Sequence, residues 1–268
     1  YLAAYISMKH ENKVWLHTSK PEAFNDTIAL IEEEKNITHH ITLHCITSSY
    51  EEAVSNADYI LITYPSFMME KTIESILPYL KKGAVVGAIP GFGGKEYLID
   101  KLLDKGCIFF GTQRVPSIIR LEKYGESVLL KQKNPFMKIR VIPGEYSEKV
   151  AKDMSNFIDI PCIPLNSYLA ITLSPSNPTM HPSRLYELFH DYVEGEHIYE
   201  RNPYFYEEWG TLASTELLKL DEELEAIFNA FNENGDFDPR DIEKIKSRYN
   251  INTAEELSEK INTAPGFI

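Results

Sequence analysis

The sequence predicts an α/β domain built on a doubly wound parallel sheet, followed by an all-helical domain. Up to about residue 163, short apolar runs such as YILIT (59–63) and AVVGAI (84–89) alternate with amphipathic stretches of helical period. Strands that are apolar on both faces are typical of parallel sheets that helices cover on either side. From residue 164 onward, every patterned stretch has a helical period. We therefore expect two domains, over residues 1–163 and 164–268.

The individual elements follow from the same periodicities. Apolar or β-branched runs between polar residues predict strands over 12–18, 40–47, 58–65, 84–90, 107–112, 127–132, 138–143 and 162–166. Apolar residues at helical spacing predict helices over 20–35, 49–57, 66–83, 95–106 and 147–158. In the second domain the same spacing predicts helices over 167–174, 183–193, 203–231, 239–249 and 253–261.

The order of these elements indicates a Rossmann-type fold in which the first elements are missing from this sequence. Such a domain carries a glycine-rich phosphate loop between its first strand and its first helix. The chain opens on YLAAYISMKHENKVWLHT, which we interpret as the middle of that helix leading into the second strand. We therefore expect the first strand and its loop to be absent from this sequence. The glycine cluster PGFGG (90–94) has the wrong spacing to replace the loop, and predicts either a tight turn before a helix or a loop that approaches a ligand.

Composition excludes several classes of partner. The 268 residues carry a formal net charge of −13, and the sequence pI is about 5.1. A chain this acidic offers no basic face to nucleic acid and is repelled by anionic membrane surfaces. No apolar run approaches the ~18 residues that a membrane helix needs. Three scattered cysteines, Cys45, Cys107 and Cys162, are typical of free buried thiols in a reducing compartment, so we expect a cytoplasmic protein.

Four segments give the sequence a specific resemblance. In chain order they are ADYILITYPSF (57–67), GAVVGAIPGFGG (83–94), GTQRVPSIIRLEKYG (111–125) and NPTMHPSRLYELF (177–189). Together they resemble the octopine/nopaline (opine) dehydrogenase family over nearly the whole chain, most specifically in the Asn-Pro-x-x-His-Pro segment. The resemblance implies an NAD(P)-binding domain and a helical domain related to that of 6-phosphogluconate dehydrogenases. It also implies the reductive condensation of an amino acid with a 2-oxo acid such as pyruvate.

The residues after the strand over 12–18 bear on the cofactor. NAD-specific domains place an acidic residue there for the ribose 2′-hydroxyl, whereas a 2′-phosphate prefers hydroxyls and a cation. Here the strand is followed by Thr18, Ser19 and Lys20, which favours NADP, with NAD as the alternative. The residues expected to line the nucleotide and nicotinamide crevice at the later strand ends are Tyr64, Pro65, Ser66, Pro90 and Gly91.

The resemblance assigns the catalytic acid and base to His181. The prolines on either side favour such a role, because Pro182 would pre-set the first helical turn and Pro178 would stiffen the approach. A place near a helix N-terminus would also disfavour the imidazolium. The alternative is a structural histidine that bonds a carbonyl at the helix entry. The family pairs its histidine with an aspartate in a C-terminal motif that we do not find before NTAPGFI (262–268), so we expect this chain to be inactive by itself.

Asp221 is the second candidate catalytic residue. It lies in the apolar stripe of the helix over 203–231, four residues after Leu217, and a carboxylate that faces a core needs a partner. We expect either a structural hydrogen bond or a role in orienting His181 or a substrate amine.

Five further residues are candidates for substrate binding. Asn177, with Thr179 beside it, could bond the substrate or cap the turn before the helix. Arg114, Arg120 and Arg184 could hold the 2-oxo acid carboxylate bidentately or serve structural roles. The sequence alone does not choose between these alternatives.

Two alternative functions stay open. One is another oxidoreductase of the same two-domain plan, acting on a 2-hydroxy acid or a phosphorylated alcohol, and the other is a non-catalytic dinucleotide-binding or scaffold protein. We expect no metal, because neither HHITLHC (39–45) nor NENGDFDPRD (232–241) has the ligand spacing of a zinc or calcium site. The expected partners are small molecules, not nucleic acid or membranes, and a homodimer is an open option.

Overall fold

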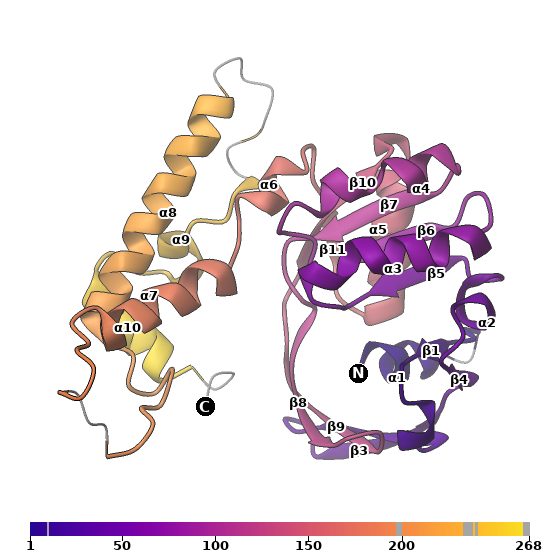
Figure 1. The fold of residues 1–268 in the computed structure, drawn as a ribbon, viewed down its shortest axis with the longest axis horizontal. Helices are drawn as coiled ribbons and strands as arrows, with labels where there is room; N and C mark the ends of the chain where they lie inside the picture. Colours follow the sequence, from indigo (N-terminus) through magenta and orange to yellow (C-terminus); the bar gives the residue numbers. More distant parts are fainter. Residues whose placement is uncertain (10, 197–199, 233–237, 239–240, 265–268) are drawn as a thin grey trace. The chain divides into compact units, whose positions relative to one another are not determined.

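The computed structural model describes residues 1–9, 11–196, 200–232, 238 and 241–264 (Figure 1). The chain divides into two compact units, Tyr1–Ile171 and Thr172–Ile268. The first unit contains the strands, and the regular elements among the described residues of the second unit are helices. The domain boundary after residue 163 stays a prediction.

Five strands form the central sheet of the first unit, in the order β11-β10-β7-β6-β5. The three strands at one side of the sheet are parallel, because β5 (Tyr59–Ile62), β6 (Val85–Ala88) and β7 (Ile108–Thr112) run in one direction. β10 (Met137–Ile142) pairs antiparallel with β7, and β11 (Cys162–Pro164) pairs parallel with β10. The expected α/β fold with a Rossmann-like sheet is confirmed, and β10 is its antiparallel member.

Helices cover both faces of this sheet (Figure 1). One set of alternating side chains of β6, β7 and β10 packs against α5 (Ser147–Ile158). The side chains between them, such as Val86 and Phe109, are also buried and point to the opposite face, where α3 (Met69–Ile76) and α4 (Asp100–Asp104) lie. This burial on both faces is the reason that β6 and β7 are apolar apart from Thr112 at the end of β7.

A separate two-stranded sheet lies near the start of the chain. β1 (Trp15–His17) and β4 (Cys45–Thr47) pair in parallel. They are preceded by α1 (Leu2–Ser7) and followed by α2 (Tyr50–Val54). The strand expected over 40–47 is therefore divided, because only its last three residues pair with β1.

The helix expected over residues 20–35 is wrong. The segment contains β2 (Thr27–Glu32), in which Ile28, Leu30 and Glu32 are buried and the intervening residues are less so. That burial has the period of a strand. β2 pairs antiparallel with β3 (Ile37–Thr42) and parallel with β9 (Ser127–Lys133), and this long-range pairing overrides the helical pattern.

These strands belong to a four-stranded sheet that the sequence did not reveal as a unit. Its order is β3-β2-β9-β8, and its last strand, β8 (Ser117–Lys123), forms an antiparallel hairpin with β9. α1 packs on the sheet through Ala4 and Tyr5, which contact a cluster that includes Leu30 and Val128. The N-terminal helix thereby acquires a buried face.

The second unit is built on two long helices. They are α7 (Asn177–Phe189) and α8 (Thr211–Phe231), and α6 (Leu169–Thr172) precedes them. α9 (Ile245–Tyr249) and α10 (Ala254–Asn262) pack against α8. No helix in the described parts of the chain is long and apolar enough to cross a membrane.

A buried tryptophan anchors the core of this unit. Trp209 is 1% exposed, and it lies in a cluster with Met180 of α7, Leu217 of α8 and Leu257 of α10. Its indole N–H donates to the Ser214 hydroxyl at 2.9 Å, so its polar group is satisfied. This core fixes α7, which carries the candidate histidine, against α8.

Candidate functional site

Polar side chains gather at the carboxyl end of β1 in the first unit. Thr18, Ser19 and Lys20 follow the strand directly, and the last two are exposed. The Lys20 backbone N–H donates to the Thr18 hydroxyl at 3.3 Å. Among the described residues, the Lys20 ammonium has no hydrogen-bond or ion-pair partner. Hydroxyls and an unpaired cation are therefore available at this strand end.

His17, which the sequence analysis did not single out, connects three strand ends. Its Nδ1 lies 3.1 Å from the Tyr64 hydroxyl after β5, and its Nε2 lies 3.2 Å from the Ser48 carbonyl oxygen after β4. The ring also stacks on Tyr50, with centroids 4.0 Å apart. Burial lowers the pKa of His17, which favours the neutral ring. His17 thereby holds Tyr64 beside the end of β1. The signal in the sequence that could have indicated this contact is a histidine at the end of a strand, directly before the hydroxyl residues Thr18 and Ser19.

The turns after β5 and β6 lie side by side. Pro65 and Ser66 follow β5, and Ser66 opens a short 3-10 turn. A Cβ on Gly93, in the turn after β6, would lie only 3.2 Å from the Ser66 hydroxyl. Gly93 also has a φ of +91°, a conformation that favours glycine. The cluster PGFGG thus provides the tight turn that was one of its two interpretations.

The backbone of this turn is already hydrogen-bonded within the protein. The Gly91 N–H donates to the Thr112 carbonyl at 2.7 Å, and the Gly91 carbonyl accepts from the Tyr168 hydroxyl at 2.8 Å. The Pro90 carbonyl accepts a hydrogen bond from the buried Lys95 ammonium. Pro90 and Gly91 can therefore shape a ligand crevice, but these backbone groups are committed elsewhere.

The two arginines after β7 bond nearby backbone. Arg114 donates from Nη1 to the Gln113 carbonyl at 3.3 Å, and the exposed Arg120 donates from Nη1 to the Ile119 carbonyl at 3.1 Å. Neither contact tests a role in binding a substrate carboxylate, so that role stays a prediction for both.

In the second unit, His181 lies in the second turn of α7 and is half-buried. Its Nε2 lies 3.1 Å from the Tyr206 hydroxyl, and its ring meets the Phe205 ring edge-on at 5.2 Å between centroids. Burial lowers the pKa of His181 below its ordinary value of 6.5. A neutral imidazole held in one orientation can accept a proton. No hydrogen bond joins it to Asp221 in the described part of the chain.

The helix that carries this histidine begins earlier than the sequence predicts. α7 starts at Asn177 with Pro178 in its first turn, and Pro182 lies inside the helix. The expectation that Pro182 sets the first turn is therefore wrong, because the Met180 N–H already bonds the Ser176 carbonyl at 2.9 Å. Since proline has no N–H, the helical bond from residue 182 to the carbonyl of residue 178 is missing.

Asn177 and Thr179 differ in their surroundings. Asn177 is exposed at the start of α7. The Thr179 hydroxyl donates to the Ser176 carbonyl at 2.9 Å, which favours the capping alternative for this residue. Substrate binding by Asn177 stays a prediction.

Arg184 is buried, with 3% of its surface exposed. It donates from Nη1 to the Glu187 carboxylate and from Nη2 to the Tyr204 carbonyl at 3.1 Å. Glu187 also accepts hydrogen bonds from the backbone N–H groups of Gly210 at 3.0 Å and Ala213 at 3.3 Å. The pair thus ties α7 to the start of α8, which favours the structural alternative for Arg184.

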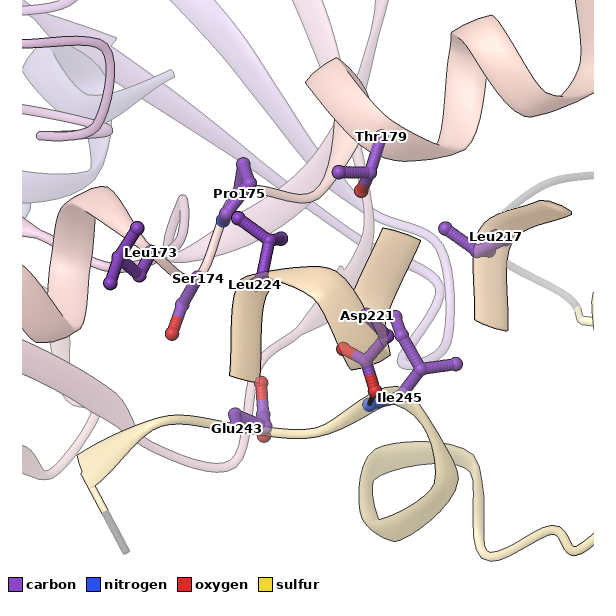
Figure 2. A pocket seen from close by; sticks show the side chains of 9 residues that line it. All are labelled: Leu173, Ser174, Pro175, Thr179, Leu217, Asp221, Leu224, Glu243 and Ile245. Carbon is purple, nitrogen blue, oxygen red and sulfur yellow. Dashed lines mark hydrogen bonds between the residues drawn. The ribbon is translucent and has the colours of Figure 1, made fainter. Parts of the chain in front are cut away.

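Asp221 of α8 borders a small cavity of about 10 Å³, which Figure 2 shows together with Thr179 and Leu217. Its Oδ2 accepts a hydrogen bond from the Ile245 backbone N–H at 3.0 Å. Burial raises the pKa of Asp221 above its ordinary value. The cavity has room for about one water molecule. These contacts favour the structural hydrogen bond among the two interpretations of this residue.

We expect Asp221 to make stability depend on pH. A carboxyl group whose pKa is raised in the folded state stabilises it below the unfolded pKa, and that contribution is lost as pH rises through the folded pKa. Asp221→Asn keeps an acceptor for the Ile245 N–H without the charge, so its urea midpoint should match or exceed that of the parent at neutral pH. Asp221→Ala should cost about 1 kcal/mol, because the N–H loses its acceptor.

Urea unfolding at about pH 4 and pH 7 tests this. As the pH rises from about 4 to 7, the free energy of unfolding of the parent should fall relative to that of Asp221→Asn. If the stability difference between the parent and Asp221→Asn is the same at both pH values, the Asp221 carboxyl does not titrate as its burial indicates.

Among the described residues, no group of three or more histidine, cysteine, aspartate or glutamate side chains could hold a metal ion. Most of the segment over 232–241, weighed above as a calcium loop, lies outside the described residues.

Comparison with known proteins identifies the helical unit. Residues 164–268 match the α-helical domain of NAD/NADP octopine/nopaline dehydrogenases. Over these residues the chain is similar to the octopine/nopaline dehydrogenase family. The match includes His181, Asp221 and the Arg184–Glu187 pair, so the resemblance seen in the sequence is confirmed.

Curated relatives and a solved structure are also similar to this chain. The chain is 33% identical over 143 residues to an uncharacterized protein, y4xO, of Sinorhizobium fredii, covering 51% of this chain and 38% of y4xO. It is 27% identical over 170 residues to tauropine dehydrogenase of Arabella iricolor, covering 60% and 42%. Each alignment spans less than half the length of the curated relative. A structure of octopine dehydrogenase with NADH and L-arginine shares the fold, with a TM-score of 0.82 and 19% identity over 99% of this chain and 71% of that one.

Proposed function

We propose that the complete protein carrying this sequence is an NAD(P)H-dependent opine-type dehydrogenase. It would condense an amino acid reductively with a 2-oxo acid. The observation that carries this proposal is the family match over residues 164–268, which includes a neutral, oriented His181 on α7. Octopine dehydrogenase, whose fold this chain shares, has been solved with NADH and L-arginine and with NADH and pyruvate.

The strand ends of the first unit fit a nicotinamide dinucleotide. In open α/β sheets such ligands lie at the carboxyl ends of the strands, where Thr18, Ser19 and Lys20 are found. The unpaired Lys20 ammonium suits an anionic group such as a 2′-phosphate, while Tyr64 and Ser66 border the neighbouring strand end. When bound, the cofactor supplies or receives the hydride.

His181 would move the proton that accompanies hydride transfer. Reduction of an imine needs a protonated nitrogen, and the reverse reaction removes that proton again. An imidazole that titrates near neutrality can serve in both directions. Its lowered pKa favours the base form at neutral pH, which suits proton removal from the amine product.

A substrate panel tests this function. The complete protein is mixed with amino acids or other amines, with pyruvate, and with NADPH or NADH, and cofactor oxidation is followed. Oxidation that requires both an amine and the 2-oxo acid supports the proposal. Oxidation with the 2-oxo acid alone would instead indicate a 2-hydroxy acid dehydrogenase, and no oxidation with any pair would indicate a non-catalytic protein.

Lys20 should set the cofactor preference. In the complete protein, Lys20→Asp should weaken NADPH binding by about 1–3 kcal/mol, the scale of a hydrogen bond to a charged group, and leave NADH binding little changed. Lys13→Asp is the matched control, because it makes the same charge change just before β1, at the opposite end of the strand. Fluorescence titration with both cofactors measures the effect, and equal losses for NADPH and NADH would contradict the assignment.

A further inference from the structure

We propose that the hairpin of β8 and β9 positions the residues that distinguish NADPH from NADH, and that Tyr124 and Gly125 at its tip are the positioning residues. Both contact the loop after β1, residues 18–25. The inference rests on the proposed function, in which residues 18–20 of this loop face the 2′ group of the cofactor ribose. It gives the four-stranded sheet a role in cofactor selection.

Gly125 meets the loop after β1 through the backbone. The Asn25 N–H donates to the Gly125 carbonyl at 2.9 Å. Gly125 is buried, and a Cβ added to it would lie only 1.8 Å from the Ala23 carbonyl oxygen. Its φ of +75° also favours glycine. The loop can therefore approach the hairpin this closely because residue 125 has no side chain.

Tyr124 holds the same part of the loop through its ring. The rings of Tyr124 and Phe24 meet edge-on, with 5.2 Å between their centroids. Such an aromatic pair stabilises a structure beyond the effect of the area that it buries. Phe24 also packs against the core cluster of the four-stranded sheet, and so does Leu16 of β1. Residues 18–20 thus lie between two anchor points on this sheet.

Short-range hydrogen bonds connect Phe24 with the candidate cofactor residues. The Ala23 N–H donates to the Lys20 carbonyl at 3.1 Å, and the Phe24 N–H donates to the Pro21 carbonyl at 3.1 Å. These bonds belong to the 3-10 turn Pro21–Ala23, which directly follows Lys20. A displacement of Phe24 would therefore also displace Lys20.

The hairpin tip is itself fixed. The Glu126 N–H donates to the Lys123 carbonyl at 3.1 Å, and the side chains of these two residues form an ion pair. The Ala29 N–H donates to the Glu126 carbonyl at 2.8 Å. Because Ala29 lies in β2, the tip is held by the strand into which the loop leads.

The position of the loop should matter more for NADPH than for NADH. A 2′-phosphate is bound by charge and by hydrogen bonds, and both weaken when the protein groups move away. The 2′-hydroxyl of NADH carries no charge. If the loop leaves its place part of the time, the apparent affinity falls in proportion to the fraction that remains in place. Loosening the hairpin contact should therefore lower the ratio of NADPH affinity to NADH affinity.

The test measures both affinities in the complete protein by fluorescence titration. Tyr124→Ala should lower the ratio of NADPH to NADH affinity about twofold to tenfold, the scale of one aromatic pair. Tyr124→Phe keeps the ring and should restore the parental ratio. Tyr124 is 51% exposed, so its replacement should leave the protein folded. Tyr79→Ala, at a 39% exposed tyrosine before β6, is the matched control and should leave the ratio unchanged.

Hydrogen exchange of the protein without cofactor gives a second measurement. The amides of residues 23–25 should exchange faster in Tyr124→Ala and in Gly125→Ala than in the parent, because the loop opens more often. The amides of residues 85–88, in the buried strand β6, should exchange as in the parent. This measurement needs neither turnover nor a bound cofactor.

Two results would overturn the inference. One is an unchanged affinity ratio in Tyr124→Ala, even with faster exchange at residues 23–25, because the hairpin would then support the loop without a role in selection. The other is an equal loss of affinity for both cofactors. Lys20→Asp in the same titration separates this failure from a failure of the cofactor assignment. If Lys20→Asp lowers the ratio and Tyr124→Ala does not, the inference alone fails.

Discussion

Replacing His181 by alanine in the complete protein should lower kcat by about 10²–10⁴, the usual contribution of a positioned acid or base. NADPH binding should stay within a few-fold of the parent, because the candidate cofactor residues lie at the strand ends of the first unit. His190→Ala is the matched control, since His190 is an exposed histidine at the end of the same helix. Steady-state kinetics and cofactor titration measure the two quantities.

The same variant should change the pH dependence. In the direction of amine oxidation His181 must be unprotonated, so the rate should rise with pH through an apparent pKa below 6.5, as burial of the ring indicates. His181→Ala should lose this limb. If the variant has a changed melting temperature but normal turnover, His181 is a structural histidine and the proposed mechanism loses its main residue.

Arg184→Met should destabilise the protein by about 3 kcal/mol, the lower end of the range for breaking a buried ion pair. The substitution preserves much of the side-chain volume but leaves the Glu187 carboxylate, 15% exposed, without its cation. Glu187 keeps its backbone bonds to the start of α8, which limits the loss. Urea unfolding followed by circular dichroism measures the change.

The control is Arg201→Met, which breaks the exposed ion pair with Glu208 and should not shift the urea midpoint measurably. The experiment also separates the two interpretations of Arg184. A variant with parental stability but a greatly raised KM for the 2-oxo acid would show that Arg184 binds substrate.

Local pattern was sufficient for the elements whose burial matches their periodicity. The strands β6 and β7 are buried on both faces, so their sequences are continuously apolar, and the sheet they form follows from that. In α5 and α8, the apolar residues at helical spacing likewise indicate the face that each helix buries. His181 could be singled out from the sequence because the segment that resembles the family, residues 177–189, is short and contiguous.

The failures occurred where distant residues decide the structure. Residues 27–32 carry apolar side chains compatible with both a helix and a strand, and only pairing with β3 and β9 selects the strand. The start of α7 was misplaced for a different, local reason: the residues before Pro182 already form a helical turn, so Pro182 does not begin the helix.

The sequence by itself determined the strands of the central sheet and the helices that cover it, the acidic charge and the segment that carries the candidate histidine, because each depends on neighbouring residues. The tertiary structure alone decided which groups meet. It paired Tyr206 with His181, Tyr64 with His17, and Glu187 with the start of α8. Such contacts join residues separated by 23 to 47 positions, and a hydrogen bond across that distance leaves no periodic signal in either segment.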